Sequence, residues 1–166
     1  YVYLKGTTKK DNLFGLSGLK KWNDIVVVEG ELDALHALVK GIENVVATSG
    51  GALTTELLQS AKEKGIKNVT LLLDNDKAGE SFIKKSIEAA EQMGMTAFVA
   101  TLTDAKDVDE FLKNHTGEEL KSIIDKANTA YIYQLRKMIM EAIDEQGGEG
   151  GIIPDKNRVE LKRKVI

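Results

Sequence analysis

Two short apolar runs that each stop at an acidic residue constrain this chain more than any other feature. Residues 25–28 are Ile-Val-Val-Val and precede Glu29, and residues 69–73 are Val-Thr-Leu-Leu-Leu and precede Asp74. Short runs rich in branched apolar residues predict buried strands. An acid directly after such a strand lies at the carboxyl edge of the sheet, where α/β proteins bind their ligands.

The apolar runs alternate with helical patterns along the chain. Two more runs lie at residues 45–47 and 97–100, and apolar residues three and four apart predict helices over 32–39, 53–64 and 78–93. Glycines stand where these helices should end, at Gly41, Gly65 and Gly94. The order predicts an α/β fold, with a Rossmann-like, four-stranded, mainly parallel sheet that has helices on both faces.

This order also brings the two acid-tipped strands together. If the first strand is central, the chain winds one way to the second strand and the other way to the third. The first and third strands then flank the topological switch point, where Glu29 and Asp74 meet. Asp33 and Asp76 follow them closely in the sequence and add two more acids at this edge.

Four acids in one small region repel one another unless a cation joins them. The chain has no cysteine, and its two histidines are His36 and His115, so we expect a hard ion with oxygen ligands. Mg²⁺ needs only one or two carboxylates when water and phosphate oxygens complete its shell. We therefore predict a Mg²⁺ site built on Asp74 and Asp76, in which Mn²⁺ substitutes.

Composition narrows the class of protein further. The 166 residues carry a net charge of −3, which counts only weakly against nucleic-acid binding because a basic groove can coexist with metal-bound acids. The absence of cysteine excludes disulfides, thiolate zinc sites and a cysteine nucleophile within this chain. We see no signal peptide or spanning stretch and expect a cytoplasmic protein with no membrane partner.

We expect four parts along the chain. A lead-in covers residues 1–24, the core covers 25–115, C-terminal helices cover 116–146, and a glycine-rich linker with a basic tail covers 147–166. Within the lead-in, residues 13–16 could add a strand or hairpin. The chain looks like a fragment of a longer protein.

Structural roles compete with the metal role at several acids. Asp76 stands where the N-cap of the helix beginning at Lys77 is expected, and Asp is common at that position. Asp107 and Glu110 have the spacing of a capping box. Asp33, taken alone, would be a solvated helix position.

Weaker signals concern phosphate binding. Lys77 could offset nearby acids or contact a phosphate, and Gly79 permits a ligand or backbone to approach the start of its helix. Gly50 and Gly51 follow the second strand and either offer N–H groups to a phosphate or form a tight turn.

Together these residues resemble a known family. Glu-Gly-Glu-Leu-Asp at 29–33, Asp-Asn-Asp-Lys-Ala-Gly at 74–79 and Lys-Asp-Val-Asp at 106–109 are similar to the motifs of TOPRIM domains. Such domains occur in DnaG-type primases, phage-like primase-helicases, topoisomerases, small nucleases and RecR-type recombination mediators. The E-G-x-x-D form and Leu-Phe-Gly-Leu at 13–16 resemble the primases.

The resemblance implies a role for each acid. Glu29 matches the family's catalytic glutamate, a general base or a ligand of a second metal. Asp74 and Asp76 match its main metal-binding pair. The acids that would support metal binding are Asp33, Asp107 and Asp109.

The resemblance further implies the catalytic domain of a DNA primase, which makes RNA primers on single-stranded DNA during replication by Mg²⁺-dependent nucleotidyl transfer. The implied partners are single-stranded DNA template, nucleoside triphosphates, a zinc-binding module and a helicase in the full protein or complex. The cysteine-free chain lacks that zinc module, and Lys77 replaces an arginine common in primases. We do not expect the fragment to prime by itself.

Two other classes remain open at this point. A metal-dependent nuclease of the OLD or M5 type would use the same acids with water as the nucleophile. A RecR-like module would bind DNA or protein without catalysis, although the presence of all six acids argues against it. The motifs alone do not separate primase from nuclease, whereas flanking domains would.

Overall fold

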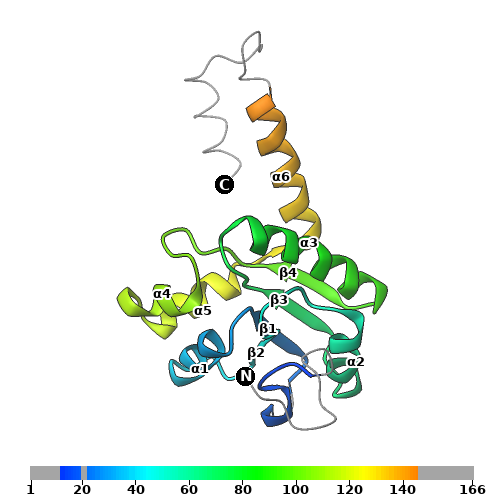
Figure 1. The fold of residues 1–166 in the computed structure, drawn as a ribbon, viewed down its shortest axis with the longest axis vertical. Helices are drawn as coiled ribbons and strands as arrows, with labels where there is room; N and C mark the ends of the chain where they lie inside the picture. The colour runs from blue at the N-terminus through cyan, green and yellow to red at the C-terminus, as the bar shows by residue number, and fades with distance from the viewer. Residues whose placement is uncertain (1–11, 20–21, 146–166) are drawn as a thin grey trace. The chain divides into compact units, whose positions relative to one another are not determined.

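The computed structural model describes residues 12–19 and 22–145, which divide into two compact units after Ala127 (Figure 1). The first unit contains, in chain order, η1 (Leu16–Gly18), β1 (Asp24–Val28), α1 (Glu31–Val39), β2 (Val45–Ala47), α2 (Thr55–Glu63), β3 (Asn68–Leu71), α3 (Lys77–Gln92), β4 (Thr96–Val99), α4 (Val108–Asn114) and α5 (Gly117–Asp125). The second contains β5 (Asn128–Thr129) and α6 (Ala130–Glu145).

The parallel sheet has the predicted topology. The four predicted strands lie in the order β2-β1-β3-β4, and each neighbouring pair is parallel. β1 lies beside β3 with Ile25 opposite Val69 and Val27 opposite Leu71. The switch point between β1 and β3 is therefore confirmed. The two-residue strand β5 was not predicted, because Asn-Thr carries no apolar pattern.

Helices cover both faces of this sheet (Figure 1). Val26 and Val28 belong to a core cluster that includes apolar residues of α1, α4 and α5. Ile25 and Val27 point the other way, because side chains alternate along a strand, and both are fully buried. β1 thus reads as a continuous apolar run because it is covered on both sides.

Local signals explain where the helices begin and end. Gly41, Gly65 and Gly94 have φ of 97°, 86° and 67° just beyond α1, α2 and α3, which confirms the predicted left-handed caps. α2 begins at Thr55 rather than at the predicted residue 53, because the Thr54 hydroxyl caps it by accepting from Leu57 N–H at 3.3 Å.

The N-terminal segment is neither a full strand nor a hairpin where it is described. Phe14 makes an isolated antiparallel bridge to Ala47, with two backbone hydrogen bonds of 2.9 and 3.0 Å. Leu13 and Leu16 are buried beside it, and η1 follows. Residues 1–11, 20–21 and 146–166, which include the predicted linker and basic tail, lie outside the described residues. In the described ranges, every helix is too short or too polar to cross a membrane.

Ser86 generates a stability prediction. Its hydroxyl, fully buried on α3, accepts a 2.8 Å hydrogen bond from the buried Leu53 N–H just before α2. Ser86→Ala should leave that N–H unpaired and lower the free energy of unfolding by about 1–3 kcal/mol. Urea denaturation measures the change. Ser81→Ala, an exposed position on the same helix, is the matched control, and an equal loss there would contradict this assignment.

Candidate metal-binding and catalytic site

The candidate site lies where β1 and β3 end. Glu29 directly follows β1, and Asp74 follows the buried pair Leu72 and Leu73 beyond β3. Leu72 N–H donates to the Val27 carbonyl at 2.9 Å, so the two chain segments stay paired up to the acids. The predicted meeting of Glu29 and Asp74 follows from this pairing.

Glu29 is held by the loop after β2. Gly50 N–H donates to the Glu29 carbonyl at 3.0 Å, and the buried Thr48 hydroxyl lies 3.4 Å from the same oxygen. Burial raises the pKa of the Glu29 carboxyl above its usual value, and the negative charges of Asp74 and Asp76 raise it further. The carboxyl therefore binds a proton more readily than an exposed glutamate does.

The Gly50–Gly51 turn serves the fold directly. Ser49, Gly50 and Gly51 have φ of 63°, 87° and 156°, a left-handed run that glycine allows. Thr48 closes the turn by donating from its hydroxyl to the Gly51 carbonyl at 2.8 Å. The Gly50 N–H is directed at Glu29 rather than at an external anion, which fits the tight-turn interpretation; phosphate binding here stays a prediction.

Asp74 is the least exposed of the two β3-loop acids. Its side chain is 18% exposed, compared with 41% for Asp76. Burial raises the pKa of Asp74, although the Lys106 ammonium, 3.5 Å from Oδ2, opposes that rise. A partly buried carboxylate whose cationic partner lies 3.5 Å away is a favourable ligand for a metal ion.

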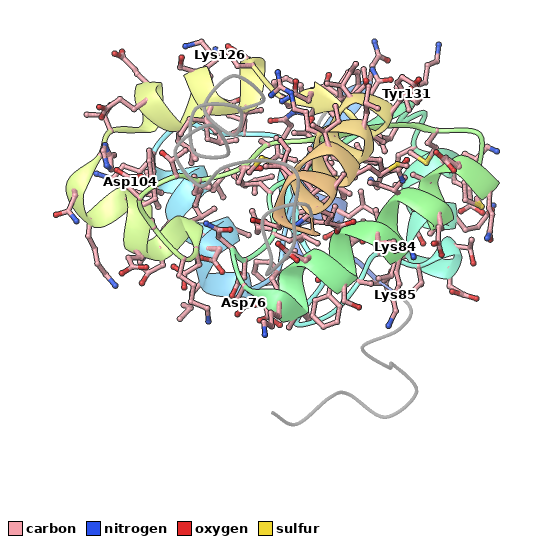
Figure 2. All side chains as sticks on the ribbon, turned by 90° about the horizontal axis from the view of Figure 1, so that it is seen from above. Asp76, Lys84, Lys85, Asp104, Lys126 and Tyr131 are labelled. Atoms are coloured by element: carbon pink, nitrogen blue, oxygen red, sulfur yellow. The ribbon has the colours of Figure 1, made fainter. Side chains whose placement is uncertain are left out.

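Asp76 is the N-cap of α3, as the capping interpretation predicted (Figure 2). Its Oδ1 accepts hydrogen bonds of 2.9 Å from the N–H groups of Ala78 and Gly79, and these bonds lower its pKa. Its other oxygen, Oδ2, lies 3.5 Å from the Lys106 ammonium. The cap uses one oxygen, so a metal role for the second stays a prediction.

Gly79 lets α3 approach the site. A Cβ at this position would lie 1.9 Å from the Asp74 carbonyl oxygen, so only glycine fits without a shift of the backbone. The close approach is made by backbone rather than by a ligand. Lys77 is exposed at the first position of α3, and its contact with phosphate stays a prediction.

Asp33 joins α1 to α4. Its Oδ1 accepts from Asp109 N–H at 2.9 Å, and burial raises its pKa although this hydrogen bond opposes the rise. A Cβ on Gly30 would lie 2.7 Å from Asp33 Oδ2, so Gly30 makes room for the carboxylate. Asp33 is thus not the solvated helix position that it would be in isolation.

The third acidic pair has structural partners. Asp107 caps α4 by accepting from Glu110 N–H at 2.8 Å, as the capping interpretation predicted. The Glu110 carboxylate accepts from the Lys106 N–H, whereas a full capping box would have it accept from the Asp107 N–H. The Asp109 carboxylate lies 2.5 Å from His36 Nδ1 and 2.8 Å from Lys113 Nζ. These partners occupy the Asp109 carboxylate, whereas its N–H supports Asp33.

Lys106 belongs to the candidate site, although sequence reasoning did not single it out. Its ammonium lies 3.5 Å from Oδ2 of both Asp74 and Asp76, and these two acids raise its pKa. The available signal was its position as the first residue of the third acidic motif. Nothing in the sequence indicates that its side chain returns to the loop after β3.

The donor set fits a divalent cation with an incomplete protein shell. An ammonium already lies between the oxygens of Asp74 and Asp76, so the pair accepts a shared cation. Among the residues that the structure describes, no three histidine or acidic side chains form a ready metal cage. Two carboxylates with water and phosphate oxygens are a common Mg²⁺ arrangement.

Comparisons with known proteins point to one family. The profile of a family described as Toprim-like matches residues 26–112. A DNA primase of Aquifex aeolicus is 33% identical over 145 residues, which are 85% of this chain and 29% of that protein. The chain therefore spans less than a third of the length of this curated relative.

Solved structures share the fold. The crystal structure of the zinc-binding and RNA polymerase domains of Aquifex aeolicus primase matches with a TM-score of 0.70 and 29% identity, over 97% of this chain and 42% of that one. The DnaG primase catalytic domain bound to single-stranded DNA matches with a TM-score of 0.70 and 21% identity, over 99% of this chain and 59% of that one.

Gly79→Ala should destabilise the protein although alanine favours helices. The added Cβ would overlap the Asp74 carbonyl, so we expect a loss of about 1–3 kcal/mol in the free energy of unfolding by urea denaturation. Gly18→Ala is the control, because its Cβ would have no heavy atom within 4 Å. Unchanged stability of the Gly79 variant would contradict the close approach.

Glu29→Gln should stabilise the metal-free protein at neutral pH. The pKa of Glu29 is raised on folding, so ionising this carboxyl costs stability as pH rises from its usual range through the raised value. The variant avoids that cost, and its advantage should vanish below about pH 4, where both states are protonated. Thermal unfolding followed by circular dichroism at several pH values, with chelator, measures the difference. Glu88→Gln, an exposed change on α3, is the control, and a destabilised Glu29 variant at neutral pH would refute the prediction.

Proposed function

Because this chain belongs to the Toprim-like family, we propose that it is the catalytic domain of a DNA primase that joins nucleotides into RNA primers on single-stranded DNA. The observation that carries the proposal is the similarity to a DNA primase over 85% of the chain, which includes every candidate acid. Since the chain spans only 29% of that relative, primer synthesis is proposed for the full protein.

The acids divide the chemical work between them. Mg²⁺ would be held by the Asp74 carboxylate and by Asp76 Oδ2, the oxygen that does not take part in the helix cap. When bound, the ion would stabilise the attacking and leaving oxygens and neutralise charge on the transferred phosphate. Glu29 would accept the proton of the attacking hydroxyl, a role favoured by a pKa raised towards the working pH.

The remaining acids would position this machinery. Asp33 fixes α1 against α4 through the Asp109 N–H, and Asp107 begins α4 by capping it. We assign both to holding the edge of the sheet in shape around the metal. The carboxylate of Asp109 would contribute indirectly, because His36 and Lys113 already contact it.

The proposed partners follow from the relatives. A single-stranded DNA template is supported by the DnaG catalytic domain solved with such DNA, and nucleoside triphosphates would supply the primer. A zinc-binding domain accompanies the Aquifex aeolicus polymerase domain, which supports a corresponding module in the full protein or its complex. A helicase is a further proposed partner, expected from the resemblance to primases and primase-helicases. Such a replication protein would work in the cytoplasm.

The metal role of Asp74 can be tested on the chain itself. Unmodified chain should bind Mn²⁺ by isothermal titration calorimetry and unfold at a higher temperature with Mn²⁺ present. Asp74→Asn should lose both responses, and it leaves the Asp76 helix cap in place. Asp125→Asn, an exposed change at the end of α5, should keep both. An Asp74 variant that binds Mn²⁺ like the unmodified chain would overturn the metal assignment.

A primer-synthesis assay on the full protein then separates the reaction classes. We expect RNA products on single-stranded DNA, and their loss with Asp74→Asn or Glu29→Gln. Cleavage of DNA without primer synthesis would instead indicate the nuclease alternative. Binding of DNA without either reaction would indicate the RecR-like alternative.

A further inference from the structure

We propose that Lys106 is a built-in counter-cation of Asp74 and Asp76, and that a divalent metal ion binds there by displacing its ammonium. The inference rests on the proposed metal role of these two acids and adds an exchange step to it. It assigns a function to a residue that does not itself ligate metal. The supporting observations are the symmetry of the two contacts, their length, and the way the Lys106 backbone is fixed.

The two contacts place the ammonium between the carboxylates. Lys106 Nζ lies 3.5 Å from Oδ2 of Asp74 and 3.5 Å from Oδ2 of Asp76. Asp76 Oδ2 is the oxygen that does not cap α3, so the ammonium contacts the same oxygen that a metal ion would use. The ammonium and a metal ion therefore cannot both lie between these two carboxylates at the same time.

The length of these contacts makes the ammonium replaceable. On α4, Lys113 Nζ lies 2.8 Å from Asp109 Oδ2, a direct charge-assisted hydrogen bond, whereas Lys106 Nζ lies 3.5 Å from each of its partners. The Lys106 side chain is 56% exposed, so solvent screens its attraction to the acids. A divalent ion carries twice the charge and bonds to the oxygens directly, so it should prevail.

The Lys106 backbone is fixed independently of its side chain. Its N–H donates to Glu110 Oε2 at 2.7 Å, and its carbonyl accepts from Asn75 N–H at 2.7 Å. Asn75 lies between the two acids, and its side-chain amide also donates to the Leu102 carbonyl at 3.2 Å. The side chain can therefore leave the carboxylates while the loop that supports them stays in place.

This arrangement solves a problem that the metal-free site would otherwise have. Glu29, Asp74 and Asp76 place negative charges close together, and uncompensated charges of one sign destabilise a fold. A tethered ammonium relieves that repulsion without any ion from solution. The same ammonium competes with the metal ion for the carboxylates. The more strongly Lys106 is attracted to Asp74 and Asp76, the weaker the affinity for the metal ion should be.

The test measures Mn²⁺ affinity and thermal stability of the 166-residue chain with Lys106→Met and Lys106→Arg. Lys106→Met should unfold at a lower temperature in chelator and bind Mn²⁺ about threefold to tenfold more tightly by calorimetry, the fold-change expected from losing two exposed ion pairs. Saturating Mn²⁺ should remove most of the stability difference. Lys106→Arg keeps the charge and should bind Mn²⁺ no more tightly than the unmodified chain.

Lys113→Met is the matched control. It also removes one positive charge, but Lys113 pairs with Asp109 rather than with Asp74 or Asp76. Equal tightening in this control, or in Lys106→Arg, would overturn the exchange. Unchanged or weaker Mn²⁺ binding by Lys106→Met would also overturn it, while Asp74-dependent binding by the unmodified chain would leave the proposed metal site standing. Mn²⁺ binding that does not respond to Asp74→Asn would remove the metal site and the exchange together.

Discussion

The parallel pairing of β1 with β3 is the constraint on which the rest of the structure depends. It aligns Ile25 with Val69 and continues through the Leu72 N–H, so the two segments reach the edge of the sheet together. Glu29 and Asp74 follow at once, and burial raises the pKa of both carboxyls. The stability of the apolar sheet is what holds these acids close enough to repel one another.

Backbone N–H groups limit this repulsion by donating hydrogen bonds to the other acids of the candidate site. Asp76 and Asp107 cap helices, and Asp33 receives a backbone hydrogen bond from α4. Each of these contacts neutralises part of a charge with N–H dipoles while it positions an element next to the site. Structural and chemical roles are therefore not alternatives at these positions, because one carboxylate has two oxygens and can serve both.

The sequence predicted the elements whose signals are local. Apolar runs and helical spacing placed β1 to β4 and α1 to α3, and the caps at Asp76 and Asp107 followed from residue type and spacing. Parallel-strand topology also predicted that β1 lies beside β3, but side-chain contacts made by loops far apart in the sequence could not be predicted in this way. Lys106 meets Asp74 only because the loop before α4 packs on Asn75, and β5 forms from two residues without an apolar pattern.

α3 links the candidate site to the segment that leads into α2. At Gly79 its backbone touches the Asp74 carbonyl, and two turns later Ser86 binds the Leu53 N–H ahead of α2. A helix is stiff along its axis, so α3 couples the position of the Asp74 carbonyl to the position of the segment that begins α2. The position of Asp74, the proposed metal ligand, is thereby tied to the packing of α2, a helix that contributes no acid to the candidate site.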